Sequence, residues 1–297
     1  MIALIYEGPK AEYNIFNNIK KVFFTDDTIV KISLDSMQEK LEFIDASYGG
    51  NIFDFYNSFS KDQDMDIIAF IQERIRNNTA LSKKYSDFLK YDRSMFSEIY
   101  LFFDFEIHHN LNYGNKNRGI EPQKDLERKI LLLEAMLNLF SNETENGKLY
   151  LSYPMIESLR DIKKNNVCCD RCCEALVNLT SYKAIVHEAT HDFSNYGKLS
   201  LNEWVHFVSH ALQKANCVVN KKYEVVDYKN FISDLTQKKI FDSQVDVCKK
   251  QSKVFILNGV SLFLLEYFGS AWWGEEGFIN RNVNMYRLSS PCCTERE

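Results

Sequence analysis

The chain has 297 residues, of which 45% are hydrophobic and 26% are charged, a balance that is typical of globular proteins and argues against disorder. Its net charge of −5 provides no global basic field, so a nucleic-acid substrate would need a local basic patch or a partner that supplies one. Glycine (11 residues) and proline (4 residues) are scarce, which favours long helices over a turn-rich β sandwich.

The N-terminal segment MIALIYEG is too short for a signal peptide and has no basic leader. The longest apolar run, 254–268, contains Asn258, Gly259 and Glu266 and falls short of a membrane span. We therefore expect a cytoplasmic protein that does not contact membranes. In that compartment its eight cysteines are expected to be reduced thiols.

Strand and helix patterns alternate over roughly the first 160 residues. Short apolar runs predict strands, and apolar side chains at three- and four-residue spacing predict helices. The predicted strands are Ile2–Tyr6, Thr28–Leu34, Glu98–Phe105 and Lys148–Tyr153, and the predicted helices contain Ile15 to Phe23, about 52–89, and Leu126 to Phe140. This alternation predicts an α/β fold with a mostly parallel sheet flanked by helices.

The predicted domains are residues 1–160, with a helical insert at about 45–95, and a mainly helical C-terminal region at 161–297. In the second region the strand patterns stop, and helical patterns include Leu201–Ala215 and Val254–Phe268. The boundary near residue 160 is soft because no low-complexity linker marks it.

The first predicted strand ends in an acidic segment. Glu7 follows it directly, and Gly8 then lets the backbone turn sharply into a helix. Glu12 lies about one helical turn further on, where it can face the same site as Glu7.

Two more acidic segments follow predicted strands. Asp104 and Glu106 lie two residues apart, a spacing that puts both side chains on one face of a strand. Glu157 follows Tyr-Pro-Met just after the strand at 148–153. Ligands bind beyond the carboxyl ends of strands in α/β sheets, and gathered carboxylates suit Mg²⁺, which prefers oxygen ligands. These acids therefore predict metal-dependent phosphoryl-transfer chemistry on a nucleic acid.

The segments EGPKAE at 7–12, FFDFEIHH at 102–109 and YPMIES at 153–158 resemble a known fold. They are similar to motifs of the TOPRIM fold of topoisomerases, primases and OLD-family nucleases, whose hallmarks are a strand-end Glu-Gly and a later Asp-x-Asp. The closer resemblance is to the stand-alone TOPRIM effectors of bacterial anti-phage systems, of the PARIS type and the AbiL- and RloB-like types. Those effectors pair a TOPRIM subunit with an ABC-type ATPase partner.

The resemblance implies a metal-dependent endonuclease in residues 1–160. Glu7, Asp104 and Glu106 would bind Mg²⁺ or Mn²⁺, with Glu12 and Glu157 as further ligands or water-positioning groups. The chain would be the toxic effector of an abortive-infection system, which cleaves host tRNA or DNA once the ATPase releases it. A homodimer is compatible with this. Glu106 stands where the family has Asp, and its longer side chain leaves open whether one or two ions bind.

Two other functions remain as interpretations. One is a non-catalytic TOPRIM-like protein that docks the ATPase. The other is a zinc metalloprotease, because HEATH at 187–191 matches H-E-x-x-H, in which two histidines bind Zn²⁺ and Glu188 acts as general base. His206 and His210 share this spacing, and Glu203 is near enough in sequence to be a third ligand. The extended pattern with a third histidine is absent.

Several other residues are candidates for binding. The segment VCCDRCC at 167–173 is interpreted as small thiols in a core, a structural zinc site or a redox switch. Aromatic residues near the C-terminus are interpreted as base-stacking platforms or as core anchors. The candidates for nucleic-acid contacts are His108, His109, Lys10, Lys116, Arg118, Lys124, Trp272, Trp273 and Phe278.

Overall fold

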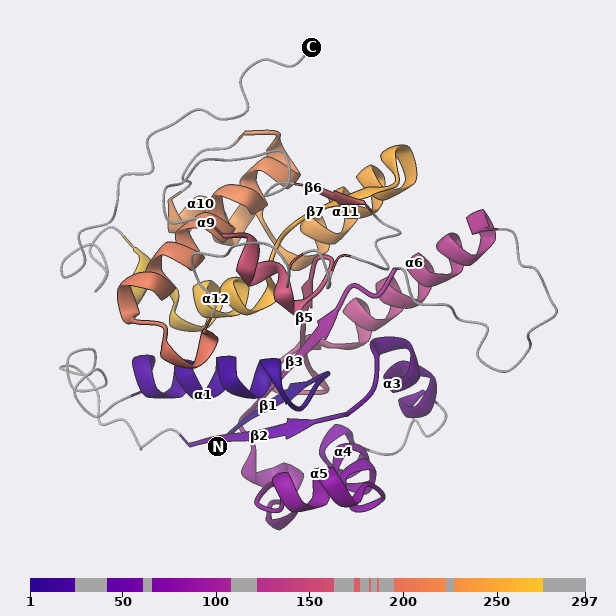
Figure 1. The fold of residues 1–297 in the computed structure, drawn as a ribbon, viewed down its shortest axis with the longest axis vertical. Helices are drawn as coiled ribbons and strands as arrows, with labels where there is room; N and C mark the ends of the chain where they lie inside the picture. The colour runs from indigo at the N-terminus through magenta and orange to yellow at the C-terminus, as the bar shows by residue number, and fades with distance from the viewer. Residues whose placement is uncertain are drawn as a thin grey trace. The chain divides into compact units, whose positions relative to one another are not determined.

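The computed structural model describes residues 1–24, 42–60, 66–107, 122–162, 174–176, 182, 186, 195–222 and 227–274 (Figure 1). The chain divides into two compact units. The first comprises Met1–Asn14 and Met37–Leu151, and the second comprises Ile15–Ser36 and Ser152–Glu297. The strand predicted at Thr28–Leu34 lies outside the described residues.

A five-stranded sheet carries the first unit. Its strands are β1 (Ile2–Tyr6), β2 (Phe43–Ser47), β3 (Glu98–Asp104), β4 (Ser141–Asn142) and β5 (Gly147–Ser152), in the order β2-β1-β3-β5-β4. β1 pairs in parallel with β2 and with β3, whereas β4 pairs antiparallel with β5. The predicted α/β fold with a mostly parallel sheet flanked by helices is confirmed.

The apolar runs form strands because the sheet buries them on both faces. All five side chains of β1 are at most 1% exposed, and the middle of β3 is buried as well. Continuous apolar sequence is typical of such strands in parallel sheets. β2 was not predicted, because Asp45 interrupts its apolar residues and the strand lies at the edge of the sheet.

Helices in the first unit follow the predicted pattern between residues 52 and 89. They are α3 (Ile52–Phe59), α4 (Ile67–Arg76) and α5 (Thr79–Lys84), followed by the 3₁₀ turns η1 (Phe88–Lys90) and η2 (Arg93–Met95), and later by α6 (Pro122–Leu139). Asn51, Asp66 and Asn78 cap the three helices by accepting hydrogen bonds from first-turn backbone N–H groups. α4 packs against β2 and α5 (Figure 1). α1 (Ala11–Phe23) begins in the first unit and ends in the second.

The C-terminal region of the chain, which belongs to the second unit, is mainly helical, as predicted, but it also contains strands. Its elements are η3 (Ile156–Asp161), β6 (Glu174–Leu176), η4 (Tyr196–Lys198), α9 (Leu201–Asn220), α10 (Tyr228–Asp234), α11 (Gln237–Gln251), β7 (Lys253–Phe255) and α12 (Gly259–Trp273). The expectation that strands stop after Glu157 is wrong, because β6 and β7 pair antiparallel. None of the helices in the described part of the chain is long and apolar enough to cross a membrane.

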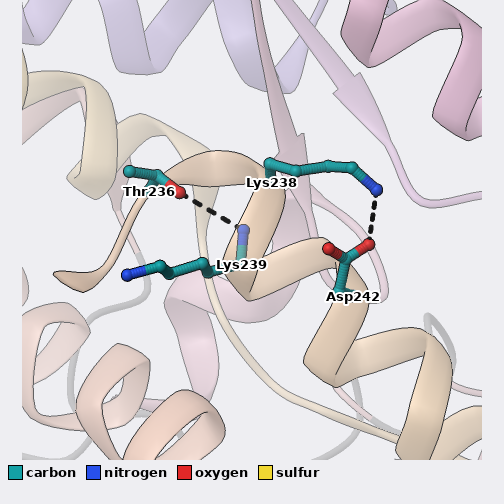
Figure 2. Close-up of polar contacts among 4 residues, drawn as sticks. All are labelled: Thr236, Lys238, Lys239 and Asp242. Atoms are coloured by element: carbon teal, nitrogen blue, oxygen red, sulfur yellow. Dashed lines mark hydrogen bonds and ion pairs between the residues drawn. The ribbon is translucent and has the colours of Figure 1, made fainter.

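The start of α11 shows how polar residues fix a helix end in this unit. The hydroxyl of Thr236 accepts a hydrogen bond from the backbone N–H of Lys239, at 3.3 Å, and so caps the helix. One turn along, the ammonium of Lys238 lies 2.6 Å from the carboxylate of Asp242 (Figure 2). Because both partners of this pair are exposed, it contributes little to stability.

Asn258 joins α12 to η3 inside the second unit. Its side-chain oxygen accepts from the N–H of Val260 at 2.9 Å, which caps α12 and explains why the helix begins at Gly259 and not at the predicted Val254. Its Nδ2 donates to the carbonyl of Ile156 and the hydroxyl of Ser158, at 3.1 and 3.0 Å. One buried amide therefore holds the segment on which Glu157 lies.

We expect Asn258→Ala to lower the free energy of unfolding by about 2–4 kcal/mol, because a helix cap contributes about 1 kcal/mol and buried groups without a partner cost about 1–3 kcal/mol. Asn258→Ser, which keeps an acceptor for the cap, should lose less. Urea unfolding followed by circular dichroism measures both. Asn138→Ala, at an exposed position on α6, is the control, and equal stability of Asn258→Ala and wild type would refute the anchoring role.

Candidate metal centre

The carboxyl ends of β1 and β3 lie side by side, because these strands pair in parallel with Tyr6 opposite Phe102. Glu7 follows β1 directly, Asp104 ends β3, and Glu106 lies two residues further. One carboxylate oxygen from each of these three residues lies within 4.8 Å of the other two, and each residue is half-buried. The structure thus brings together the three predicted metal ligands, here called the acidic triad.

The backbone of Glu7 is bound on both sides. Its N–H donates to the carbonyl of Phe102 on β3 at 3.1 Å. Its carbonyl accepts from the hydroxyl of Ser47, the last residue of β2, at 3.1 Å and from the N–H of Gly49, just after β2, at 3.0 Å. The carboxylate of Glu7 also accepts from the backbone N–H of Asp104 at 3.1 Å. Both neighbouring strands therefore fix where this carboxylate lies.

Glu12 stabilises the turn that follows Glu7. Its carboxylate accepts a hydrogen bond from the N–H of Gly8 at 3.0 Å. A Cβ atom at position 8 would lie 3.0 Å from each carboxylate oxygen of Glu12, so a larger residue there would require this carboxylate to move. The structure gives Glu12 a role in shaping the turn, whereas its predicted role as a further ligand stays a prediction.

Glu106 reaches the triad by a turn, not by strand alternation. The prediction that Asp104 and Glu106 share one face of a strand is wrong, because β3 ends at Asp104 and Glu106 has a φ of +39°. A non-glycine residue in left-handed conformation costs about 1–3 kcal/mol, so its surroundings must hold it there. Phe105 and Ile107 on either side are 0% and 3% exposed and provide this anchorage.

Lys129 on α6 is a residue of this site that the sequence did not reveal. Its buried ammonium donates to the carbonyl of Ile107 at 2.9 Å, directly after Glu106. The same ammonium lies 2.6 Å from the carboxylate of Asp125, with side-chain exposures of 7% and 18%. A lysine four residues after an aspartate usually indicates a solvated helix pair, and for that reason its sequence gave no signal.

The electrostatics of the triad favour a cation. Burial raises the pKa of Glu7 well above its ordinary value, and the nearby charge of Glu106 raises it further. The hydrogen bond from the N–H of Asp104 lowers this pKa, whereas the charge of Glu12 raises it. Without a cation, the folded chain therefore favours protonated Glu7, and a divalent ion would compete with that proton.

Two buried tyrosines, one of them directly before Glu7, are hydrogen-bonded to each other. The hydroxyl of Tyr6 donates to that of Tyr85 at 3.3 Å. Burial raises the pKa of Tyr85 to about 12, and burial together with the charge of Asp45 raises the pKa of Tyr6 further still. Both hydroxyls stay neutral at physiological pH, so they act as hydrogen-bonding groups and not as bases.

Glu157 lies in the second unit, on η3, where it is 3% exposed. Burial raises the pKa of the Tyr182 and Tyr196 hydroxyls, and the charge of Glu157 adds to both shifts. Tyr182 donates to the carboxylate of Asp161, and Arg160 donates to the hydroxyl of Tyr196 at 3.1 Å. Glu157 is thus part of a buried polar cluster, and its role as a metal ligand stays a prediction.

Part of the predicted zinc site lies within the described residues. HEATH at 187–191 and the cysteines of 167–173 lie outside the described residues, as do His108 and His109. His206 and His210 lie on α9 with ring centroids 6.2 Å apart, and burial lowers the pKa of His210. The carboxylate of Glu203, however, accepts from the backbone N–H and hydroxyl of Ser200 in a capping box. Glu203 therefore serves as a helix cap.

The C-terminal tryptophans pack inside the second unit. Trp272 is 1% exposed and lies against Phe23 and Phe268, with ring centroids at 5.2 and 4.4 Å. The indole N–H of Trp273 donates to the carbonyl of Leu264 at 3.0 Å. This supports the interpretation of Trp272 as a core anchor. Phe278 lies outside the described residues.

The acidic triad has the donor set of a site for a hard divalent cation. Three carboxylates suit Mg²⁺ or Mn²⁺, which prefer oxygen ligands and keep several waters when few protein ligands bind them. Within the described ranges, these three residues form the one group of three or more His, Cys, Asp or Glu side chains close enough to hold a metal ion. Comparisons with protein-family models, with curated proteins and with solved structures find no match for the chain.

The raised pKa of Glu7 predicts how stability depends on pH. Below about pH 4.5 the carboxyl is protonated in both the folded and the unfolded chain and contributes nothing. Above that pH the unfolded chain releases the proton while the folded chain keeps it, so the free energy of unfolding falls as pH rises towards the raised pKa. We expect Glu7→Gln to remove this fall and to stabilise the metal-free protein at pH 7.

Thermal unfolding between pH 4.5 and 8 in a chelating buffer measures this effect. Glu145→Gln, at an exposed position in the same unit, should follow the wild type. Added Mg²⁺ should raise the melting temperature of the wild type and leave that of Glu7→Gln unchanged, since a ligand stabilises only the state that binds it. A wild-type profile that does not fall with pH would contradict the charge repulsion inferred for the triad.

The variant Lys129→Met tests whether Lys129 holds the turn on which Glu106 lies. We expect a loss of about 3–5 kcal/mol in stability, because Asp125 is left as a mostly buried charge without its partner. We also expect Mn²⁺ affinity to fall about 10–100-fold, as is typical when groups behind metal ligands are removed. Titration calorimetry at a temperature where the variant is folded measures that affinity. Lys90→Met, at an exposed pair with Asp87, is the control, and unchanged Mn²⁺ affinity in folded Lys129→Met would limit Lys129 to a structural role.

Proposed function

We propose that this chain is a divalent-metal-dependent nuclease. The observation that carries the proposal is the convergence of Glu7, Asp104 and Glu106, whose ligand oxygens lie within 4.8 Å of one another at the carboxyl end of two parallel strands. The resemblance of three segments to TOPRIM motifs adds support, since two of those segments carry these acids. Phosphodiester hydrolysis is the reaction that such a site and such motifs have in common.

All three members of the triad would bind the cation in this mechanism, each held in place by a different part of the fold. Glu7 would bind the cation from a backbone held by β2 and β3, with its carboxylate oriented by the N–H of Asp104. Asp104 and Glu106 would bind it from the other strand, with Glu106 placed by the turn that Lys129 holds. A bound divalent ion supplies an activated water and stabilises charge that develops on the phosphate. Fixed ligands matter because small displacements of a reacting group reduce rates strongly.

The resemblance also supports a biological role. It favours a toxic effector of an abortive-infection system, restrained by an ABC-type ATPase until phage is sensed, with host tRNA as the favoured substrate and DNA as the other. A tRNA would suit recognition by shape and by unpaired loop bases. A cytoplasmic location follows from this role. The ATPase would then regulate access to the acidic triad rather than its chemistry.

The test compares the purified wild type with Asp104→Asn and Glu7→Gln. End-labelled tRNA and a DNA oligonucleotide of equal length are incubated with each protein in Mg²⁺, Mn²⁺ or chelator. We expect metal-dependent cleavage by the wild type and a loss of about 100-fold or more in each variant, because removing groups that only support a ligand already costs about 10–100-fold. Both variants keep the shape of the site, and circular dichroism checks their folding.

Glu188→Gln is the matched control, since it removes the general base that HEATH would supply. It should cleave like the wild type. Cleavage that survives in both Asp104→Asn and Glu7→Gln would overturn the nuclease site. A folded wild type that binds Mn²⁺ but cleaves neither substrate, alone or with its ATPase, would favour the non-catalytic interpretation. Proteolysis that depends on Glu188 would favour the zinc metalloprotease.

A further inference from the structure

Helices α4 and α5 carry a concentration of positive charge on a chain whose net charge is −5. Arg74, Arg76, Lys83 and Lys84 are all exposed, and Glu73 is the single acid on either helix. None of these four basic residues forms an ion pair within the part of the chain that the structure describes. The charge is therefore available to a ligand.

Arg74 is fixed to the turn that follows β2. Its Nε donates to the carbonyl of Tyr48 at 3.2 Å, and its Nη2 donates to that of Gly49 at 3.4 Å. The guanidinium also lies over the ring of Tyr48, 4.9 Å from the centroid. Gly49 is the residue whose N–H donates to the carbonyl of Glu7. Arg74 is thus one residue removed, through Gly49, from the backbone of Glu7, and several of its five N–H donors remain for a ligand.

Lys84 is fixed to the turn that follows β1. Its ammonium donates to the carbonyl of Pro9, two residues after Glu7. It also lies 3.7 Å from the ring centroid of Tyr13 and 5.6 Å from that of Tyr85, so two aromatic faces hold the cation. An ammonium has three donors, and two remain for a ligand. Lys10, the predicted phosphate contact, is exposed directly after Pro9.

We infer that Lys10, Arg74 and Lys84 form a basic face, on the turns that follow β1 and β2, that binds the phosphate backbone of nucleic acid. This inference rests on the proposed function, and it names the residues that hold the substrate. A chain of phosphates is the ligand that matches it, because single exposed cations bind a single phosphate weakly whereas a row of them binds a polyanion. The planar guanidinium of Arg74 offers paired donors to one phosphate, and the lysines act as point charges.

The position of the basic face explains how an acidic protein would engage nucleic acid. The turns after β1 and β2 each contribute a carbonyl to one of its two fixed cations, and the same turns hold Glu7. Phosphates on the basic face would therefore place a neighbouring phosphate at the metal ligands. Fixed cations lose little side-chain freedom on binding, which favours Arg74 and Lys84 over mobile surface lysines.

The test measures binding separately from cleavage. Fluorescent tRNA and a single-stranded DNA of equal length are titrated with the wild type, Arg74→Gln, Lys84→Gln, the double variant and Lys90→Gln, in Ca²⁺ and at several salt concentrations. We expect each single variant to weaken binding about tenfold and to reduce the slope of log K against log[salt] by about 0.7–0.9, the value for one phosphate contact. Lys90→Gln removes another exposed lysine of the same unit, one that is paired with Asp87, and it should match the wild type.

The outcomes separate this inference from the nuclease proposal. The basic face would be overturned if Arg74→Gln, Lys84→Gln and the double variant bind nucleic acid as tightly as the wild type and with the same salt slope. This holds whatever the cleavage assay shows. Reduced slopes in a protein that does not cleave would establish the basic face and count against the nuclease. Mn²⁺ affinity should stay at the wild-type value in all variants, and its loss would mean that the substitutions disturb the triad. A wild type that binds neither tRNA nor DNA would overturn the basic face outright.

Discussion

The pairing of β1 with strands on both sides is the constraint on which the acidic triad depends. Because both the N–H and the carbonyl of Glu7 are bound to neighbouring strands, only its side-chain torsions remain to be set. The N–H of Asp104 then binds its carboxylate. Backbone hydrogen bonds of a buried parallel sheet thus determine the position of one charged group. A sheet holds a side chain more rigidly than a loop does, and a metal site needs ligands that are held rigidly.

The triad is costly to the fold that holds it. A half-buried carboxylate beside another is destabilising unless a proton or a cation neutralises it, and the raised pKa of Glu7 expresses that cost. The left-handed turn at Glu106 adds backbone strain. Apolar packing offsets both, since the side chains of β1 are almost fully buried and Phe105 and Ile107 are fixed in the core. Local destabilisation supported by a rigid surrounding is typical of functional sites.

The sequence predicts what depends on local pattern and misses what depends on the tertiary fold. Continuous apolar runs revealed β1 and β3, and strand ends revealed Glu7 and Asp104. Glu106 lies beside Glu7 and Asp104 for another geometric reason than the predicted one, because no pattern indicates a left-handed turn at a glutamate. Lys129 had no signal at all, since its function depends on the burial of α6 against the segment after β3. β2 escaped prediction because a short edge strand with a central Asp45 lacks a distinctive period.

Acidic and basic groups of the first unit act together once a cation is included. If the basic face binds phosphate as inferred, the triad without a cation would repel the phosphate that the basic face attracts. A divalent ion bound by the triad would make the local charge less negative, so that both the triad and the basic face could attract a polyanion. The affinities for metal and nucleic acid should then be coupled, and linkage requires that each ligand raises the affinity for the other by the same factor. An acidic protein would in this way bind a polyanion more tightly in its metal-loaded form than in its metal-free form.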